Sequence, residues 1–597
     1  MRKHITLALL ILMLTPAFSS MQAGERLIMQ LKDFTQSEVK SGGFILPAGI
    51  KIHIYSLGSG EKGGSFSSTG MYAYGWIIDA DSREVVWKMD RDNTTRQDEY
   101  RKFDDVISLP KGSYEVYFAA YGFASQSVFS NFIFNIDRRH QTSGDESYRQ
   151  KGFLNWLEDF FGGDYRKNWK RYAKNWEISI SVDNNTPDIS MFNAPKEFPH
   201  ILYKATKIGE NEHLHQRFTL SQNLPIRIYA IGEKNYSNSF ADYGWIINMK
   251  THQRIWDMEK GNTDHAGGAD KNIKYDNVLT FPAGEYVLYY TSDDSHSYTD
   301  WNAAPPDDPL NYGITLCGRD ENSKNEFKLT ASAKEEQNVI VQLTKVGNDE
   351  TKSASFTLKE ESSLRIYAIG ERSNSRRQMA DFGWIINTKT REKVWTMDAQ
   401  ATEHAGGGDK NRMIDEVITL PKGTYAVFYQ TDDSHAFDDW NDSPPFDPEH
   451  WGITVYGEGE SFTMKNIEKN VTSQEPGVIA QIVRVGDKAN KTQSFRLDKS
   501  TRVRIYAIGE GQNREMYDYG WIENTNTGSV VWEMTYSMTF HAGGGRKNRS
   551  VNTTIVLDKG NYILHFVSDD SHSFNDWNTD PPDDPTMWGI TLYNDDK

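Results

Sequence analysis

The chain has 597 residues, a formal net charge of −17 at pH 7 and one cysteine, Cys317. The acidic balance argues against nucleic acid and anionic membrane surfaces as general partners, since both repel a negatively charged protein. A lone cysteine excludes an intramolecular disulfide, so stability must come from hydrophobic cores, contacts between modules or bound ions.

The N-terminus has the pattern of a secretory signal peptide. Arg2 and Lys3 precede an apolar run from Ile5 to Leu14, and small residues follow it. We expect residues 1–23 to be cleaved and the mature protein to be secreted, in the periplasm or outside the cell. No later apolar stretch approaches the length of a membrane-spanning helix, which predicts a soluble protein without a transmembrane segment.

One sequence unit occurs four times along the chain. Its (Tyr/Phe)-Gly-Trp-Ile motif contains Trp76, Trp245, Trp384 and Trp521, and in the last three copies a His-Ala-Gly-Gly motif follows at a constant distance. Repetition at a fixed period predicts a tandem array of structural modules. The expected boundaries are 24–182 for module 1, 195–325 for module 2, 338–465 for module 3 and 477–597 for module 4.

Module 1 carries an insertion, at about 139–176, that differs in sequence from the corresponding segment of the other three modules. Aromatic and leucine side chains from Phe153 to Phe161, and again from Tyr165 to Trp176, follow helical spacing around Gly162-Gly163. This pattern predicts a short helical hairpin inserted in a β-domain. Its apolar stripe either packs on its own module or docks on a partner or envelope surface.

Each copy consists of short runs rich in β-branched and aromatic residues, separated by Gly, Asp, Asn, Ser and Lys. These runs predict strands joined by turns. With no helical pattern between them, the expected fold class is all-β, a tandem array of four antiparallel, jelly-roll-like or Greek-key β-sandwiches. The tracts 319–337 and 457–476 are either linkers or extra edge strands.

The sharpest local signal is a Leu-Pro-(Lys/Ala)-Gly-x-Tyr turn that leads into a strand, as at Leu109–Tyr114 and Leu420–Tyr425. Together with the preceding strand, which ends in Val-Trp, it resembles the secreted bacterial β-sandwich modules of the prepeptidase C-terminal kind. The resemblance covers about the central half of each copy. It implies non-catalytic modules that are often calcium-stabilised or glycan-binding, and it does not include the motifs described next.

A long polar loop occurs in modules 2, 3 and 4, at 292–316, 431–455 and 568–592. It repeats Asp-Asp-Ser-His, Trp-Asn and Pro-Pro-x-Asp-Pro in register. Loops of this length within compact domains are usually functional or disordered. The recurring Pro and Trp favour order, so we expect an ordered loop that holds a ligand.

Three elements are kept or lost together: the Asp before (Tyr/Phe)-Gly-Trp-Ile, the His-Ala-Gly-Gly histidine and the long loop. Module 1 lacks all three, and Ala73 replaces the Asp. Because loops gather at the ends of a sandwich, we expect one cluster in each of the other modules. The candidate metal ligands are Asp242, His265, Asp293, Asp294, His296 and Asp308; Asp381, His404, Asp432, Asp433, His435 and Asp447; and Asp518, His541, Asp569, Asp570, His572 and Asp584.

Such a cluster suits a divalent cation. Ligation by oxygen alone favours Ca²⁺, whereas histidine participation favours Zn²⁺ or Mn²⁺, and the spacing matches no zinc motif or EF-hand. A metal-free hydrogen-bond network that fixes the loop on the sandwich is the structural alternative. The aromatic and amide side chains that would contact a saccharide are Trp301, Asn302, Trp440, Asn441, Trp577 and Asn578.

The expected function is therefore a secreted, non-catalytic binding protein. Its modules 2 to 4 would bind a divalent cation, with Ca²⁺ favoured, or a polar ligand such as an extracellular glycan or protein surface. The alternatives are a metal-dependent hydrolase of extracellular polysaccharide and a purely structural envelope protein. We assign no catalytic residue, because an active site seldom occurs three times in one chain and no nucleophile elbow, HExxH or phosphate loop is present.

Overall fold

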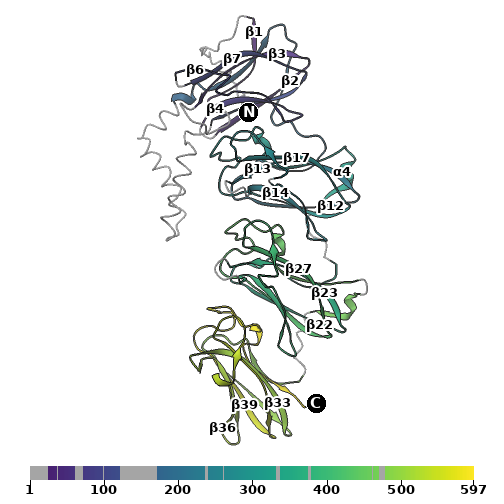
Figure 1. Ribbon diagram of the computed structural model, residues 1–597, viewed down its shortest axis with the longest axis vertical. Coiled ribbons are helices and arrows are strands. Elements are labelled where there is room, and N and C mark those ends of the chain that lie inside the picture. The colour runs from purple at the N-terminus through teal and green to yellow at the C-terminus, as the bar shows by residue number, and fades with distance from the viewer. Residues whose placement is uncertain are drawn as a thin grey trace, which may run out of the picture. The chain divides into compact units, whose positions relative to one another are not determined.

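The computed structural model describes residues 24–35, 38–60, 71–98, 100–120, 171–235, 240–259, 261–330, 337–373, 378–459, 462–469 and 477–596. Nearly all of the regular secondary structure in these residues is β-strand, so the predicted all-β fold is confirmed (Figure 1). The chain divides into two compact units, Met1–Lys334 with modules 1 and 2, and Glu335–Lys597 with modules 3 and 4. Within the described ranges no helix is long and apolar enough to cross a membrane.

The described residues of the first unit contain strands β1 to β20. Module 1 contains β1 (Glu25–Lys32), β2 (Glu38–Leu46), β3 (Ile50–Gly60), β4 (Met71–Asp79), β5 (Val85–Lys88), β6 (Thr95–Gln97), β7 (Tyr100–Leu109), β8 (Gly112–Ala120), β9 (Glu177–Asp183) and β10 (Ser190–Phe192). Module 2 contains β11 (Ile201–Thr206), β12 (His213–Leu220), β13 (Leu224–Lys234), β14 (Phe240–Asn248), β15 (Arg254–Asp257), β16 (Asp264–His265), β17 (Asn272–Phe281), β18 (Gly284–Thr291), η1 (Pro309–Asn311), β19 (Gly313–Gly318), α4 (Ser323–Glu326) and β20 (Phe327–Thr330).

The second unit repeats the same order of elements. Module 3 contains β21 (Val339–Thr344), β22 (Thr351–Leu358), β23 (Ser362–Glu371), β24 (Phe382–Asn387), β25 (Lys393–Thr396), β26 (Glu403–His404), β27 (Asn411–Leu420), β28 (Gly423–Gln430), η2 (Pro448–His450), β29 (Gly452–Gly457), η3 (Met464–Asn466) and β30 (Ile467–Lys469). Module 4 contains β31 (Val478–Val483), β32 (Asn490–Leu497), β33 (Thr501–Gln512), β34 (Glu515–Met516), β35 (Tyr519–Asn524), β36 (Ser529–Glu533), η4 (Tyr536–Met538), β37 (Phe540–His541), β38 (Asn548–Leu557), β39 (Gly560–Val567), η5 (Pro585–Met587) and β40 (Gly589–Asn594).

Each module is built from two antiparallel layers. In module 3 one sheet has the order β21-β29-β23-β27-β26 and the other β25-β24-β28-β22-β30. Module 4 has β31-β40-β33-β38-β37 and β32-β39-β35-β36. In modules 1 and 2 the two layers are joined into one sheet by pairing of β3 with β4 and of β13 with β14.

The core of each module lies between the two layers. In module 3, Ile366 of β23, Val427 of β28 and Val455 of β29 are fully buried. Arg365, the neighbour of Ile366 along the strand, points to the other face, where it is ion-paired with Asp415 at 2.7 Å. This alternation of apolar and polar side chains is what a sheet with one solvated face requires.

The predicted Pro-x-Gly-x-Tyr turn has a physical explanation in the structure. The hydroxyl of Tyr114 donates to the carbonyl of Pro110 at 2.9 Å, and Tyr425 donates to Pro421 at 2.7 Å. The tyrosine hydroxyl therefore closes the turn that precedes its own strand. The same bond closes the variant turns of modules 2 and 4, through Tyr286 and Tyr562.

The tracts after modules 2 and 3 supply extra edge strands. Residues 327–330 form β20 on the outer side of β12, and residues 467–469 form β30 on the outer side of β22. Modules 2 and 3 thus extend past the predicted limits, 325 and 465, because these strands complete their sheets. The predicted signal peptide and most of the helical insertion lie outside the described residues; residues 171–173 are helical.

Candidate metal centre

A cluster of three carboxylates lies at one end of module 2. Glu233 is near the end of β13, Asp242 lies opposite it in β14, and Asp293 follows β18. One oxygen from each side chain lies within 4.8 Å of the others. Modules 3 and 4 repeat the arrangement with two further triads: Glu371, Asp381 and Asp432, and Glu510, Asp518 and Asp569.

A glycine before each glutamate allows the two strands to approach closely enough to form the cluster. A Cβ atom on Gly232 would lie 2.0 Å from the carbonyl oxygen of Asp242, and one on Gly370 would lie 2.1 Å from that of Asp381. No side chain fits at such distances, so the Gly-Glu pair at the end of the strand is a steric requirement.

The strand aspartate holds the start of the long loop. Asp242 is fully buried; its Oδ1 accepts the backbone amide of Asp293 at 2.9 Å and its Oδ2 accepts the Tyr312 hydroxyl at 2.6 Å. In module 3, Asp381 accepts the amide of Asp432 and the indole N–H of Trp451. Module 4 repeats this pattern with Asp518, Asp569 and Trp588.

The glutamate of each cluster has one paired and one unpaired oxygen. Oε1 of Glu233 is 2.8 Å from the ammonium of Lys271, and Lys410 and Lys547 stand in the same relation to Glu371 and Glu510. The other oxygen, Oε2, is buried and has no hydrogen-bond partner among the described residues in any of the three copies. Since buried polar atoms are nearly always bonded, an oxygen left open three times at the same place could accept a ligand atom.

Burial changes the proton affinity of these groups. It raises the pKa of Asp242 to about 8 and that of Asp518 to about 7, and it raises the pKa of Asp381 well above its ordinary value. Burial also raises the pKa of Glu233 to about 7, although Lys271 opposes the change. If a divalent cation binds, all three carboxylates ionise, and the cation balances their excess of negative charge over the one ammonium.

The loop histidine is held by an asparagine and is not a member of the carboxylate cluster. His296 is fully buried, and its Nε2 lies 2.6 Å from Oδ1 of Asn272. The Nδ2 group of Asn272 donates to the carbonyls of Gly267 and Ala304, so its Oδ1 accepts and the ring nitrogen donates. Burial lowers the pKa of the module 3 counterpart, His435, to about 3, which keeps the ring neutral.

The His-Ala-Gly-Gly histidine braces its own turn. Nε2 of His265 lies 3.0 Å from the carbonyl oxygen of Ala269, and His404 and His541 make the same contact with Gly408 and Gly545. The turn then reaches the long loop through the amide of Asp307, which donates to the carbonyl of Ala266. These segments thus lie at one end of the module, while both histidines bond to loop groups and not to the carboxylates.

Two residues at the centre of this network were missed by the sequence analysis. They are the Glu of the Ile-Gly-Glu strand end and the Asn of the Lys-Asn pair that follows His-Ala-Gly-Gly. Both recur in modules 2, 3 and 4, which was a usable signal. The three asparagines are Asn272, Asn411 and Asn548, and each joins a histidine to two loop carbonyls.

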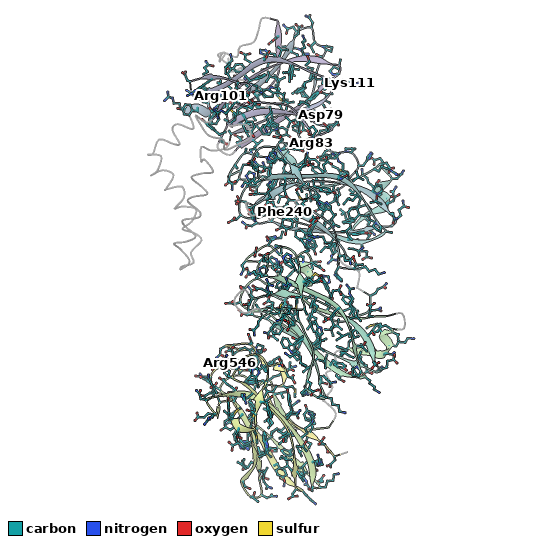
Figure 2. The ribbon with its side chains drawn as sticks, in the orientation of Figure 1. Asp79, Arg83, Arg101, Lys111, Phe240 and Arg546 are labelled. Carbon is teal, nitrogen blue, oxygen red and sulfur yellow. The ribbon has the colours of Figure 1, made fainter. Side chains whose placement is uncertain are left out.

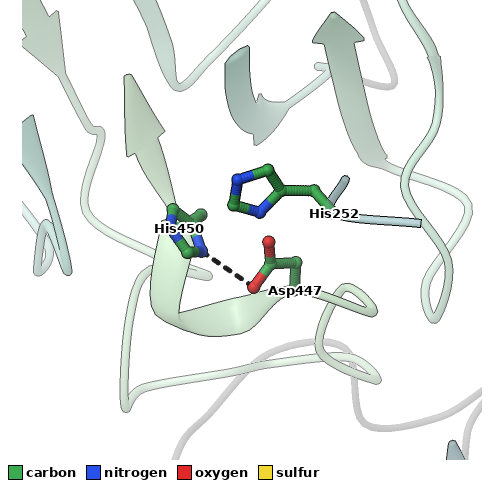
Figure 3. Close-up of side chains that lie close together, drawn as sticks. All are labelled: His252, Asp447 and His450. Carbon is green, nitrogen blue, oxygen red and sulfur yellow. Dashed lines mark hydrogen bonds and ion pairs between the residues drawn. The ribbon is translucent and has the colours of Figure 1, made fainter. Parts of the chain in front are cut away.

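The remaining predicted ligands lie outside the triads. Asp294, Asp433 and Asp570, the second aspartates of the motif, are exposed. The aspartate late in the loop makes other bonds: Asp308 accepts from the Tyr229 hydroxyl at 2.8 Å, and Asp447 is 2.9 Å from Nδ1 of His450 (Figure 3).

The same late segment of the loop also holds the preceding module of its unit. The guanidinium of Arg83, labelled in Figure 2, is ion-paired with Asp308 and with Glu115 of module 1. The Trp76 indole donates to the carbonyl of Asp307 at 2.7 Å. In the second unit, Arg391 and Trp384 make the equivalent bonds to Asp584 and Asp583 of module 4.

The predicted sugar-contacting tryptophans pack inward. Trp301 is only 3% exposed and meets His296 and Tyr312 edge to face at 5.0 and 5.1 Å. Trp440 and Trp577 pack in the same way and are half-buried. The neighbouring amides Asn302 and Asn441 accept hydrogen bonds from the cluster lysines, Lys271 and Lys410. These side chains therefore support the loop and the lysine.

The chain matches no known protein-family model, and no curated protein is similar to it in sequence. The resemblance to prepeptidase C-terminal modules stays a prediction.

Proposed function

We propose that this protein is a secreted, non-catalytic binding protein in which modules 2, 3 and 4 each take up one divalent cation, with Ca²⁺ favoured. The observation that carries the proposal is the Glu-Asp-Asp triad, which recurs in three modules, each with one buried carboxylate oxygen that has no partner in the part of the chain that the structure describes. A cation at this place would give that oxygen the partner that buried polar atoms normally have.

The ligand chemistry favours calcium over a transition metal. The triads offer carboxylate oxygens, which Ca²⁺ and Mg²⁺ prefer, whereas Zn²⁺ sites in proteins commonly recruit imidazole or thiolate. Nε2 of each loop histidine is committed to an asparagine oxygen. Calcium also accepts irregular sets of six to eight oxygens, which three carboxylates with water can supply.

The lysine beside each glutamate implies weak binding. Lys271 already compensates part of the negative charge of Glu233 and would have to share that carboxylate with the cation. Extracellular calcium modules typically bind with dissociation constants of about 0.1–1 mM. At a tenfold excess over such a constant, a site that binds only the folded chain stabilises it by about 1.4 kcal/mol.

Module 1 provides an internal control. Ser59 and Ala73 occupy the positions of Glu233 and Asp242, as the paired strands show. The indole of Trp176 donates to Oγ of Ser59 at 2.9 Å and is itself fully buried. A serine and an indole offer no charge for a cation, so we expect binding in modules 2 to 4 alone.

Calcium titration of the full chain by calorimetry, together with melting in calcium and in chelator, tests the proposal. We expect three bound ions per chain and a higher melting temperature in calcium. Glu371→Gln should reduce the stoichiometry to two, whereas Glu392→Gln, which alters an exposed glutamate of the same module, should leave it at three. Identical melting curves in calcium and in chelator, with no heat of binding, would contradict the proposed cation site.

The secretion part of the proposal has its own test. Cell fractionation should place the protein outside the cytoplasm, and N-terminal sequencing of the mature protein should start just after residue 23. A cytoplasmic protein that retains Met1 would contradict it, without bearing on calcium binding by the purified chain.

A further inference from the structure

The long loops of modules 2 and 4 are each anchored at two places. In module 4 the first anchor is Asp569, a member of the carboxylate triad, whose amide donates to the strand aspartate of the triad at 2.9 Å. The second anchor is Asp583–Asp584, which bonds to module 3. The loop of module 2 has the same two anchors, Asp293 in its triad and Asp307–Asp308 against module 1. One loop therefore connects the proposed cation site with the junction between two modules.

The junction between modules 3 and 4 includes three polar bonds to the late part of the loop. The indole of Trp384 donates to the carbonyl of Asp583 at 2.7 Å, and Lys393 is ion-paired with the same residue at 2.8 Å. Arg391 is ion-paired with Asp584 at 3.0 Å, and both of these side chains are buried. All three bonds end on two consecutive loop residues, so they require the loop in its ordered conformation.

Module 1 makes the same three bonds to the loop of module 2, although it has no carboxylate triad of its own. Trp76 donates to the carbonyl of Asp307 at 2.7 Å, Lys88 is ion-paired with Asp307 at 2.6 Å, and Arg83 is ion-paired with Asp308 at 2.5 Å. The cation site connected to a junction is thus the site in the module that follows it.

Hydrogen bonds within module 4 connect the two anchors of its loop. His572, close to the triad end, is 2.5 Å from Oδ1 of Asn548, whose Nδ2 donates to the carbonyl of Asp580 at 2.9 Å. The amide of Asp583 donates to the carbonyl of Ala542 at 2.8 Å. Segments held by such single bonds open locally at a lower free energy than the strands of a core. Opening of this loop would release both anchors.

We propose that a cation bound at the triad of module 2 or module 4 also stabilises the junction with the preceding module of the same unit. This inference rests on the proposed cation sites. The cation and the preceding module both contact the ordered loop, and an open loop offers neither of its anchors. Two partners that bind the same state of a segment favour each other's binding. Removal of calcium should therefore loosen the junction, and a loosened junction should weaken calcium binding.

The two indole N–H groups that donate to the loops report on the junctions. In the full chain with isotope-labelled tryptophan, we expect the indole protons of Trp76 and Trp384 to exchange with solvent severalfold more slowly in calcium than in chelator. Glu510→Gln removes the site of module 4, so it should abolish the response of Trp384 and leave that of Trp76. Glu233→Gln should have the opposite effect. Each variant is therefore the folding control for the other.

Calorimetry tests the coupling in the reverse direction. In a full chain that carries Glu233→Gln and Glu371→Gln, only module 4 should bind calcium. Adding Arg391→Gly breaks the ion pair to Asp584 and should raise the dissociation constant severalfold, because coupling between two binding events is reciprocal. Adding Gly528→Arg instead changes the same turn of module 4, where the glycine has open space around it, and should leave the dissociation constant unchanged.

Two results would overturn the inference and leave the cation sites standing. The first is calcium binding in the calorimeter without any change in the exchange of either indole proton. The second is equal slowing for Trp384 in the native chain and in Glu510→Gln, because the effect would then not come from the site of module 4. If no calcium binds to the native chain, the cation sites and this inference are both wrong.

Discussion

The guanidinium of Arg83 in module 1 donates to both carboxylate oxygens of Asp308 in module 2, at 2.5 and 2.8 Å. Arg83 has a backbone φ of 63°, a left-handed conformation that normally favours glycine. Arg391, which binds Asp584 in the second unit, has a φ of 64°. At the same turn of module 4 stands Gly528, with φ 66° and open space around it. An arginine therefore takes this left-handed conformation in the two modules where its guanidinium pairs with a carboxylate.

Replacing Arg391 by glycine should loosen the contact between modules 3 and 4. The change relieves about 1 kcal/mol of backbone strain but leaves the buried Asp584 without its cation, so we expect a net loss of about 2–4 kcal/mol in unfolding experiments. The reverse change, Gly528→Arg, serves as the matched control and should cost no more than about 1 kcal/mol. Equal effects of the two substitutions would show that the turn matters and the ion pair does not.

Asn411→Asp should destabilise module 3 with almost no change in side-chain shape. Nδ2 of Asn411 donates to the carbonyls of Gly406 and Ser443, and a carboxylate oxygen would face the same two acceptors. We expect a loss of about 2–4 kcal/mol in denaturant unfolding. Asn526→Asp, at an exposed turn position, should change the free energy of unfolding by less than about 0.5 kcal/mol. An unchanged free energy of unfolding in Asn411→Asp would mean that the asparagine does not hold the loop.

The buried histidine of module 3 predicts a loss of stability in acid. Burial lowers the pKa of His435 to about 3, whereas in the unfolded chain it is near 6.5. The contribution of the neutral His435 ring to the free energy of unfolding is therefore fully present above pH 6.5. It is lost as the pH falls towards 3, and the loss is about 3 kcal/mol at pH 4.5. His435→Gln should be less stable at pH 8 but should lose less on acidification. Parallel pH profiles of the two proteins would refute this assignment.

His53 in module 1 should have the opposite pH dependence. Burial lowers its pKa, but hydrogen bonds to Glu25 at 2.7 Å and Asp104 at 2.8 Å outweigh burial, so the pKa is raised. The stabilisation is fully present below the unfolded pKa and is lost as the pH rises through the folded pKa. His53→Gln should therefore destabilise the protein more at pH 5.5 than at pH 8.5. NMR titration of the ring should give a pKa above 6.5.

Much of the cluster could be predicted from the repeated motifs, because residues that recur together in several modules are expected to lie close together in each. Asp242 and Asp293 were predicted to meet, and the structure joins them through a hydrogen bond of 2.9 Å. Glu233 was overlooked because it closes an ordinary-looking strand, and its place beside Asp242 depends on the pairing register of β13 with β14. Register is a property of two strands, so one strand read alone does not reveal it.

The sequence by itself determined the β-fold, the repeat and the segments that meet at one end of a module, since alternation, turn residues and periodicity are local properties. Tertiary structure alone decided which polar groups touch. His296 is hydrogen-bonded to Asn272, and Asp308 is ion-paired with Arg83. Oε2 of Glu233 is buried without a partner among the described residues. These partners lie far apart in the chain, and only the packing of strands and modules sets the distances between them.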